Sequence, residues 1–255
     1  MEREQHLVSI IMPSYNAERF ILDSINSVRN QTYQDWELLI TDDQSQDNTY
    51  AIIKSVAEED PRIKVFRLDA NSGAAVARNN SINHANGRYI AFLDSDDMWL
   101  LDKLEKQLDF MQRNKAGFSF TAYYVLDDQL QDSYIVHAPN VITYKEYLFN
   151  TIIGCLTVMV DREIIGEFRM PLLRKNQDMA TWLGLFKRGY DGYGLDIPLA
   201  RYRVVEGSIS HDKVKAAKSV WRVYREVEKL SIIQSIYYLM GYAWNATKKR
   251  FSNKL

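Results

Sequence analysis

The chain has 255 residues, of which 46% are hydrophobic and 25% charged, a composition typical of one globular α/β domain with an elaboration, or of two merged halves. A single cysteine, Cys155, excludes a disulfide framework and a cluster of thiolate metal ligands, and favours a reducing, cytoplasmic setting. The N-terminus is polar, and the apolar run that ends at Pro13 is too short for a secretory signal.

Strands and helices are predicted to alternate up to residue 97. Short apolar, β-branched runs predict strands at residues 8–12, 36–41, 63–68 and 89–93. Apolar residues at helical spacing predict helices that begin near residue 17, near residue 48 and after Gly73, the last running to about Ala85 with Gly87 as its C-terminal cap. This succession predicts βαβ units and an α/β fold with a doubly wound, mostly parallel central sheet.

The pattern changes after residue 97. We predict a helix at residues 102–113, strands at 118–125 and 156–160 separated by an irregular polar stretch, a helix at 178–188 and a strand at 199–203. No internal repeat and no low-complexity linker interrupts the chain.

Three polar clusters follow predicted strands of the first half: residues 13–16, Asp42-Asp43, and residues 94–97. Ligands of open α/β sheets bind beyond the carboxyl ends of the strands. We therefore expect these clusters to converge in space, although they are far apart in the sequence.

The acidic run Asp94-Ser95-Asp96-Asp97 is a candidate metal site. Carboxylates at alternate positions after a buried strand can share one hard cation, Mg²⁺ or Mn²⁺, which could in turn neutralise a nucleotide diphosphate. The alternative is an acidic cap for the following helix. A cap requires one Asp, whereas three crowded carboxylates repel each other without a cation, so the metal interpretation is favoured.

The other two clusters have equally ordinary alternatives. Asp43 could accept a hydrogen bond from a nucleotide base or ribose, or it could only start a helix. The segment Pro13-Ser14-Tyr15-Asn16 could be a simple strand exit. Neither glycine-rich phosphate loop, GxGxxG or GxxxxGK, is present, so phosphates would be neutralised by a metal or by Arg and Lys.

Four segments of residues 1–115 resemble, in order and spacing, the family 2 glycosyltransferases of the GT-A fold. These segments are Val8-Ser-Ile-Ile-Met-Pro-Ser-Tyr-Asn16, Glu37-Leu-Leu-Ile-Thr-Asp-Asp-Gln-Ser45, Asn71-Ser-Gly73 with Ala77-Arg-Asn79, and Gly87-Arg-Tyr-Ile-Ala-Phe-Leu-Asp-Ser-Asp-Asp97. A looser match continues through Gln177-Asp178 and through Tyr202-Arg203 with Gly207-Ser-Ile-Ser210. Within the family, the chain is similar to small enzymes that build teichuronic acid, capsule or lipopolysaccharide chains.

The resemblance implies a donor site for a nucleotide-sugar. Asp43 would contact the nucleobase, usually uracil, beside the backbone of Pro13 to Tyr15, and Arg78 would lie near the donor phosphates or sugar. Asp96 of the Asp-x-Asp motif would be the main ligand of Mn²⁺ or Mg²⁺, with Asp94 near the ribose, the sugar or the metal.

Asp178 matches the family's catalytic base, and Gln177 stands where Glu is common. Inversion requires one displacement at the anomeric carbon while the acceptor hydroxyl loses its proton, for which one carboxylate suffices. Without the resemblance, the favoured interpretation of Asp178 is a helix-start residue. Val205 replaces a histidine of the family's Tyr-Arg-x-His pattern, so no histidine there is expected to bind the diphosphate or metal.

The resemblance therefore implies an inverting transferase, with a UDP-sugar donor and a saccharide or lipid-linked acceptor. We expect residues 1–212 to form the catalytic domain, with a donor half at 1–115 and an acceptor half at 116–212, and residues 213–255 to form a basic helical extension. Acceptor specificity is expected to lie within residues 125–175. The rivals are a sugar nucleotidyltransferase, which usually has a glycine-rich phosphate loop, and a non-catalytic nucleotide- or glycan-binding scaffold.

The extension has ten Lys or Arg and two acidic residues, although the whole chain has a net charge of -1. It combines an aromatic, apolar segment at residues 232–244 with the basic cluster Lys248-Lys-Arg250 and Lys254, which fits a peripheral position on an anionic membrane surface. The alternative is a helix packed on the body or on a second subunit. No nucleic-acid motif is present, so nucleic acid is not an expected partner.

Several isolated residues are expected to be structural. Cys155 is predicted to be a small buried residue, and Trp99 and Trp182 to belong to the core. The histidines His84, His137 and His211 lack metal-ligand spacing.

Overall fold

The fold is described by a computed structural model that covers residues 4–127, 129–204 and 213–252. Its strands are β1 (Glu4–Ser14), β2 (Trp36–Asp42), β3 (Ile63–Arg67), β4 (Gly87–Phe92), β5 (Met98–Trp99), β6 (Phe118–Leu126), β7 (Asp132–Val136), β8 (Val141–Ile142), β9 (Met159–Asp161) and β10 (Gly192–Arg203). They form one sheet in the order β3-β2-β1-β4-β9-β6-β10-β5, with β7 beside β6 and β8 beside β10.

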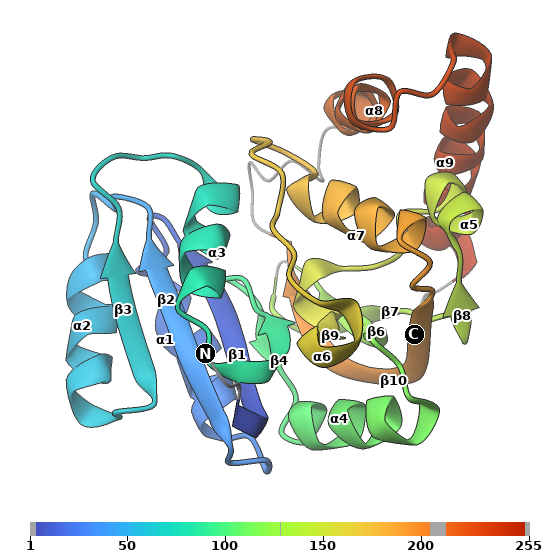
Figure 1. The fold of residues 1–255 in the computed structure, drawn as a ribbon. Coiled ribbons are helices and arrows are strands. Elements are labelled where there is room, and N and C mark those ends of the chain that lie inside the picture. The colour runs from blue at the N-terminus through green and yellow to red at the C-terminus, as the bar shows by residue number, and fades with distance from the viewer. Residues whose placement is uncertain (1–3, 128, 205–212, 253–255) are drawn as a thin grey trace.

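Helices lie on both sides of this sheet (Figure 1). They are α1 (Ile21–Arg29), α2 (Thr49–Glu59), α3 (Ala74–Asn83), α4 (Lys103–Asn114), α5 (Tyr144–Phe149), α6 (Arg162–Ile165), α7 (Gln177–Lys187), α8 (Lys213–Arg222) and α9 (Ile232–Ser252). A 3₁₀ turn at Cys155–Thr157 and a π-helical turn at Val223–Val227 complete the described elements.

The first half has the predicted parallel arrangement. Strand β1 pairs in parallel with β2 and β4, and β2 with β3, so their carboxyl ends meet at one edge of the sheet. Both faces of β1 are buried: Ile11 packs in the core layer that includes α7, whereas Ile10 and Met12 pack in the layer that includes α1, α2 and α4. Burial on both faces explains why this strand is a continuous apolar run rather than an alternating one.

The second half joins the first through an antiparallel strand. Strand β9 pairs antiparallel with both β4 and β6, and β6 then pairs in parallel with β10. Above this part of the sheet, the ring of Trp182 from α7 stacks on Phe118 with 5.3 Å between centroids. The two halves thus share one sheet, and their junction is where the carboxyl end of β4 faces the start of α7.

Four local predictions of the sequence analysis are wrong or only partly correct. Helix α3 ends at Asn83, and Gly87 begins β4 instead of capping the helix. A Cβ at Gly87 would lie 2.4 Å from the carbonyl oxygen of Leu7, so the glycine is required by the close approach of two strands. The strand predicted at residues 156–160 is confirmed only in part, because β9 begins at Met159, after the 3₁₀ turn at Cys155–Thr157. Strand β10 begins seven residues before the predicted strand at 199. The stretch predicted to be irregular contains β7, β8 and α5.

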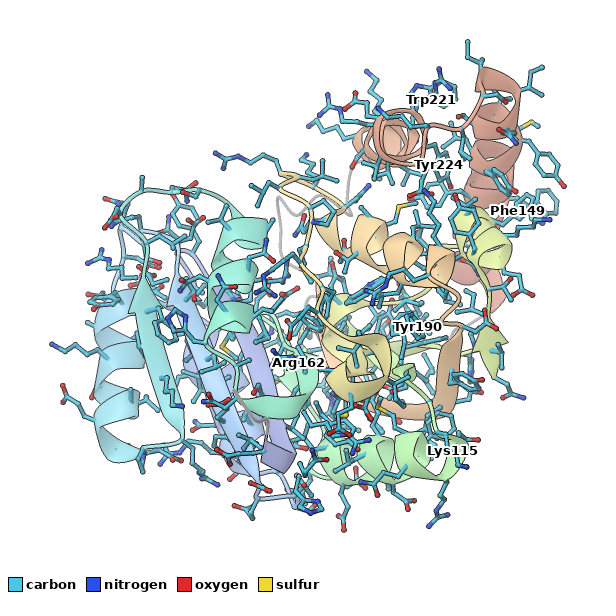
Figure 2. The ribbon with its side chains drawn as sticks, in the orientation of Figure 1. Lys115, Phe149, Arg162, Tyr190, Trp221 and Tyr224 are labelled. Carbon is cyan, nitrogen blue, oxygen red and sulfur yellow. The ribbon has the colours of Figure 1, made fainter. Side chains whose placement is uncertain are left out.

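The C-terminal helices pack against the body. Tyr224, labelled in Figure 2, is fully buried and donates a hydrogen bond to the carbonyl oxygen of Leu148 in α5. Phe149 of α5 contacts the rings of Tyr237 and Tyr238 on α9, with centroids 4.9 and 4.8 Å apart. Among the described residues, no helix is long and apolar enough to cross a membrane.

Candidate functional site

The predicted donor-side residues converge on one cavity at the carboxyl ends of β1, β2 and β4. This cavity of about 250 Å³ is lined by Pro13, Ser14, Tyr15, Asp43, Ala74, Arg78, Asp94, Ser95 and Asp96. We call it the donor cavity. Asp42 lies outside it, because its carboxylate accepts hydrogen bonds from Ser45 and pairs with Arg67 at 3.3 Å.

Asp43 holds together the loops that form this cavity. Its carboxylate accepts hydrogen bonds from the backbone amides of Ser72 at 2.7 Å and Gly73 at 2.8 Å, while its own amide donates to the carbonyl oxygen of Ser14 at 2.8 Å. Gly73 adopts φ of +94°, a conformation that favours glycine. Asp43 therefore fixes the start of α3, from which Arg78 projects.

Arg78 and Asp94 form an ion pair at the base of the donor cavity. The Arg78 side chain is only 5% exposed, so its charge is removed from water and is compensated in part by Asp94. Its Nε and Nη1 atoms are buried and have no hydrogen-bond partner among the described residues. Asp94 and Asp178 both raise the pKa of Arg78, which stays charged.

Two more carboxylates follow Asp94. Burial, and then the negative charge of Asp94, raise the pKa of Asp96 from 3.8 to about 6. Asp97 is buried, and its Oδ1 accepts a hydrogen bond from the amide of Arg203 at 2.9 Å, which ties the end of β4 to β10. Burial raises the pKa of Asp97 well above its ordinary value. Asp96 thus faces the donor cavity, whereas Asp97 serves the junction of the two halves.

A second cavity of about 470 Å³ adjoins the first. Its lining includes Ala74, Arg78 and Asp94, which the two cavities share, as well as Asp178. Four aromatic side chains also line it: Tyr123, Tyr147, Tyr202 and Tyr242. We call it the acceptor-side cavity. A molecule bound in it would contact Asp178, and the Arg78–Asp94 pair would lie between that molecule and the donor cavity.

Asp178 lies in the first turn of α7. Asn176 occupies the N-cap position with φ of +57°, and its side chain makes no capping hydrogen bond. Burial raises the pKa of Asp178, whereas Arg78 and the amide of Met179 act in the opposite direction. A carboxylate with a raised pKa at a cavity wall is a better proton acceptor than an ordinary surface Asp.

The chemistry of Asp94 and Asp96 fits a hard divalent cation. The two side chains line one cavity, and the pKa of Asp96 is raised first by burial and then by the negative charge of Asp94. No group of three or more His, Cys, Asp or Glu among the described residues is arranged to hold a metal. Mg²⁺ and Mn²⁺ are commonly held by one or two carboxylates together with phosphates and water, so two ligands are adequate.

The family model for glycosyl transferase family 2 matches residues 9–165, which include the donor cavity and the start of the second half. The chain belongs to glycosyltransferase family 2. This family 2 enzyme is 52% identical over 246 residues to the putative teichuronic acid biosynthesis glycosyltransferase TuaG of Bacillus subtilis, covering 96% of this chain and 97% of that protein. It is 41% identical over 247 residues to WfgD of Escherichia coli, named UDP-Glc:alpha-D-GlcNAc-diphosphoundecaprenol beta-1,3-glucosyltransferase, covering 96% of both chains.

Solved structures show the same fold as this glycosyltransferase. TarS of S. aureus, in complex with UDP-GlcNAc, superposes with a TM-score of 0.71 at 18% identity, covering 91% of this chain and 70% of that chain. A mannosyltransferase from Pyrobaculum calidifontis, in complex with GDP-Man and Mn²⁺, gives a TM-score of 0.69 at 17% identity, covering 97% and 76%. The predicted GT-A fold and the predicted enzyme class are confirmed.

The isolated residues of the glycosyltransferase have the structural positions predicted for them. Trp99 and Trp182 are buried in the core, and Cys155 is a buried thiol whose pKa is raised by burial. His84 stacks on Phe66, and His137 lies 3.0 Å from Asp196. His211, Val205 and residues 207–210 lie outside the described residues.

Sequence reasoning missed the aromatic lining and the contribution of the extension. Ala216 and Val220 of α8 and Tyr242 of α9 line the acceptor-side cavity, which agrees with the alternative that the extension packs on the body. The helical spacing of Ala216 and Val220 indicates a buried face, but nothing in the sequence says which surface covers it. Arg174, which lines the acceptor-side cavity and donates a hydrogen bond to Asn71 at 3.3 Å, was also missed.

Proposed function

We propose that the chain is an inverting glycosyltransferase that moves a sugar from a nucleotide diphosphate, most simply UDP, to a hydroxyl of a saccharide acceptor. The observation that carries the proposal is the adjacency of the two cavities, which share Arg78 and Asp94. Asp96 lies in one cavity and Asp178 in the other. A donor and an acceptor could therefore meet at the shared wall, as one direct displacement requires.

The donor cavity would hold the nucleotide and its diphosphate. Asp43 would contact the base beside Pro13 and Tyr15, while its carboxylate also keeps the loop before α3 in place. The Nε and Nη1 atoms of Arg78, which have no hydrogen-bond partner in the described part of the chain, are donors that suit a phosphate or sugar oxygen. A divalent cation on Asp96 and Asp94 would stabilise the negative charge of the departing diphosphate.

Asp178 would be the catalytic base. As the acceptor hydroxyl attacks the anomeric carbon, its proton would pass to the Asp178 carboxylate while the bond to the diphosphate breaks on the opposite side. Burial raises the pKa of Asp178, which favours this transfer, and the positive charge of Arg78 acts in the opposite direction. No covalent enzyme intermediate is required.

The acceptor-side cavity suits a saccharide. Tyr123, Tyr147, Tyr202 and Tyr242 offer aromatic faces and hydroxyls in a cavity that also contains charged groups, as sugars require. The names of TuaG and WfgD, and the diphosphoundecaprenol acceptor in the name of WfgD, support a lipid-linked acceptor and a role in building a surface polysaccharide.

A lipid-linked acceptor would bring the enzyme to the cytoplasmic face of the membrane. Six large apolar side chains of α9 are exposed, an unusual concentration for one helix: Ile232, Ile233, Ile236, Tyr237, Met240 and Trp244. We propose that α9 lies at the membrane interface, and the basic cluster of residues 248–250 in its sequence favours anionic lipid. The side chains of these basic residues lie outside the described residues.

A screen of nucleotide-sugars with Mn²⁺ tests the proposal. We expect one UDP-sugar to raise the unfolding temperature and to release UDP slowly by hydrolysis, and faster with a lipid-linked saccharide acceptor. NMR of the product should show the opposite anomeric configuration from the donor. Nucleotide binding without UDP release would favour a scaffold, and pyrophosphate release from a nucleoside triphosphate would favour a nucleotidyltransferase.

A further inference from the structure

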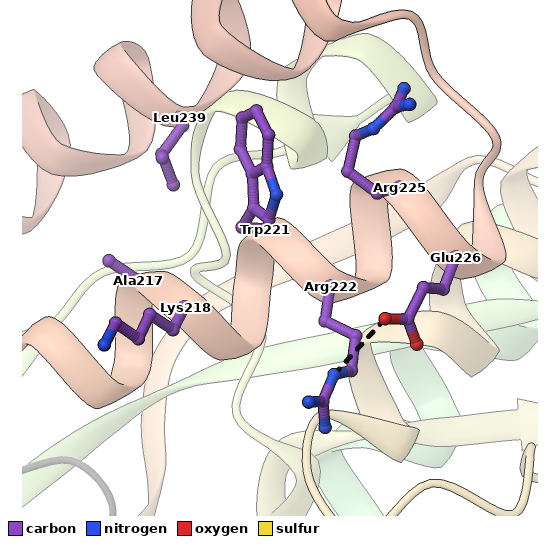
Figure 3. A pocket seen from close by; sticks show the side chains of 7 residues that line it. All are labelled: Ala217, Lys218, Trp221, Arg222, Arg225, Glu226 and Leu239. Carbon is purple, nitrogen blue, oxygen red and sulfur yellow. Dashed lines mark ion pairs between the residues drawn. The ribbon is translucent and has the colours of Figure 1, made fainter.

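A groove lies between α8 and α9 on the outside of the C-terminal extension. Its cavity of about 540 Å³ is lined by Ala217, Lys218, Trp221, Arg222, Arg225, Glu226 and Leu239. Figure 3 shows the Trp221 ring rising from its helix toward Leu239, with Arg225 one turn further along. The groove therefore combines an apolar floor with three cationic side chains and one acid.

The cations of the groove are only partly neutralised. Arg222 pairs with Glu226 at 3.5 Å, and both side chains are largely exposed. Arg225 donates a hydrogen bond to the carbonyl oxygen of Leu230 and makes no ion pair with a carboxylate within the described part of the chain. Lys218 is exposed at the rim. Arg and Lys around an indole form a favourable setting for a phosphate group at an apolar boundary.

The groove borders the exposed apolar side of α9. At 3.6 residues per turn, Ile232 and Ile236 lie on the same side of the helix as Leu239, seven and three positions before it. Leu239 is at the groove, whereas Ile233 and Trp244, 81% and 73% exposed, continue the apolar stripe away from it. A flat apolar layer that covers the stripe would thus place its polar boundary beside the cations of the groove.

Helix α8 separates this groove from the active site. Ala216 and Val220 face the acceptor-side cavity, and Ala217 and Trp221, each one position later, line the groove. Successive residues lie about 100° apart around a helix, so the groove and the cavity that contains Asp178 lie on neighbouring sides of α8. Docking at this position would bring a membrane close to the entrance for the acceptor.

We propose that this groove binds the phosphate of an anionic phospholipid, so that α8 and α9 dock the enzyme on the membrane through charge as well as apolar contact. The inference rests on the peripheral association proposed above and adds the site that recognises the headgroup. Lys218 and Arg222 would meet the phosphate, Trp221 would lie at headgroup depth, and the α9 stripe would enter the acyl boundary.

Vesicle flotation of the full chain tests this site. Wild-type protein should float with phosphatidylglycerol–phosphatidylcholine vesicles, weakly with pure phosphatidylcholine, and less as the salt concentration rises. Lys218→Gln with Arg222→Gln should weaken binding to the anionic vesicles by roughly 25-fold, about fivefold for each charge. A charge-matched control, Lys54→Gln with Arg113→Gln on the exposed surfaces of α2 and α4, should bind as the wild type does.

Two further measurements separate the outcomes. Ile233→Ser with Trp244→Ser should reduce flotation with both vesicle types. The Lys218/Arg222 variant should hydrolyse the UDP-sugar at the wild-type rate, which distinguishes loss of membrane docking from loss of enzyme activity. Three results would overturn the proposal: equal binding of the wild type to the two vesicle types, unchanged binding of the Lys218/Arg222 variant, or stabilisation of the protein by glycerol phosphate without flotation. So would a dimer in solution that does not float with vesicles.

Discussion

The guanidinium of Arg78 pairs with the carboxylate of Asp94 at the wall between the two cavities. Two nitrogens of this buried Arg78 have no hydrogen-bond partner among the described residues, so the pair is an incomplete polar network. Buried polar groups are normally satisfied, and exceptions often mark a site that a ligand completes. This network is where a donor diphosphate would supply the missing acceptors.

Arg78→Gln should therefore impair ligand binding more than folding. We expect the increase in unfolding temperature caused by UDP with Mn²⁺ to fall by at least half, because a charged hydrogen-bond partner of the diphosphate is lost. Thermal unfolding with and without the ligands measures this. Arg88→Gln is the matched control: it breaks the 2.7 Å pair with Asp161 at another edge of the sheet and should lower stability while leaving the ligand-induced increase intact.

Asp96→Ala should remove the dependence of donor binding on the cation. Titration calorimetry of UDP should show a strong effect of Mn²⁺ on the wild-type affinity and little effect on the variant, because the main carboxylate ligand is absent. Asp109→Asn, on the exposed side of α4, serves as the control and should keep the full effect. Mn²⁺-dependent binding that survives in Asp96→Ala would exclude Asp96 as the principal ligand.

The pH should control the effect of the cation. Because Asp96 has a pKa of about 6 in the folded protein and 3.8 ordinarily, the folded state retains a proton that the unfolded state loses between these values. Without a cation, the free energy of unfolding should therefore fall as the pH rises from about 4 to about 6. The raised pKa values of Asp97 and Asp178 change this free energy in the same direction.

A cation on the ionised carboxylates, as proposed, would reverse this loss of stability. We expect Mn²⁺ with UDP to raise the unfolding temperature strongly at pH 7.5 and weakly at pH 5, and Asp96→Asn to show little difference between the two. An identical Mn²⁺ effect at both pH values in the wild type would contradict the placement of the ion on Asp96.

The donor half of the fold followed from the sequence because its signals are local. Strands β1, β2 and β4 are short apolar runs that end in polar residues, and parallel pairing brings Pro13, Asp43 and Asp94 to one edge. The acceptor half did not follow, because its elements depend on distant partners. Strand β7 is half-buried against β6, and the 3₁₀ turn at Cys155–Thr157 is fixed by packing rather than by its apolar sequence.

The residues of the site also divide into those that local sequence signals predict and those that only tertiary packing brings together. The motif residues of the donor cavity could be predicted, since each follows directly on a strand. The tyrosines of the acceptor-side cavity could not, because Tyr123 and Tyr242 come from β6 and α9, and only tertiary packing brings them together. Asp178 was recognised through the family motif; from spacing alone it is an ordinary residue at the start of a helix.

Two glycines give a matched test of the acceptor half. A Cβ at Gly194 in β10 would lie 1.9 Å from the carbonyl oxygen of Pro139, so Gly194→Ala must displace backbone and should destabilise the protein by about 1–3 kcal/mol. A Cβ at Gly184 in α7 meets nothing within 4 Å, so Gly184→Ala should be neutral or stabilise by about 0.5–1 kcal/mol. Denaturant unfolding measures both changes, and an equal response of the two variants would contradict this packing.

The most direct test of the central claim compares binding and transfer in Asp178→Asn. With the donor, Mn²⁺ and a saccharide acceptor, we expect the variant to bind UDP as tightly as the wild type does, while the rate of transfer falls by about 10²–10⁴-fold. Asp191→Asn, an exposed carboxyl just beyond α7, should retain the wild-type rate. Normal UDP affinity with a lost transfer rate would support Asp178 as the base beside a separate donor site. Normal affinity with an undiminished transfer rate would contradict it.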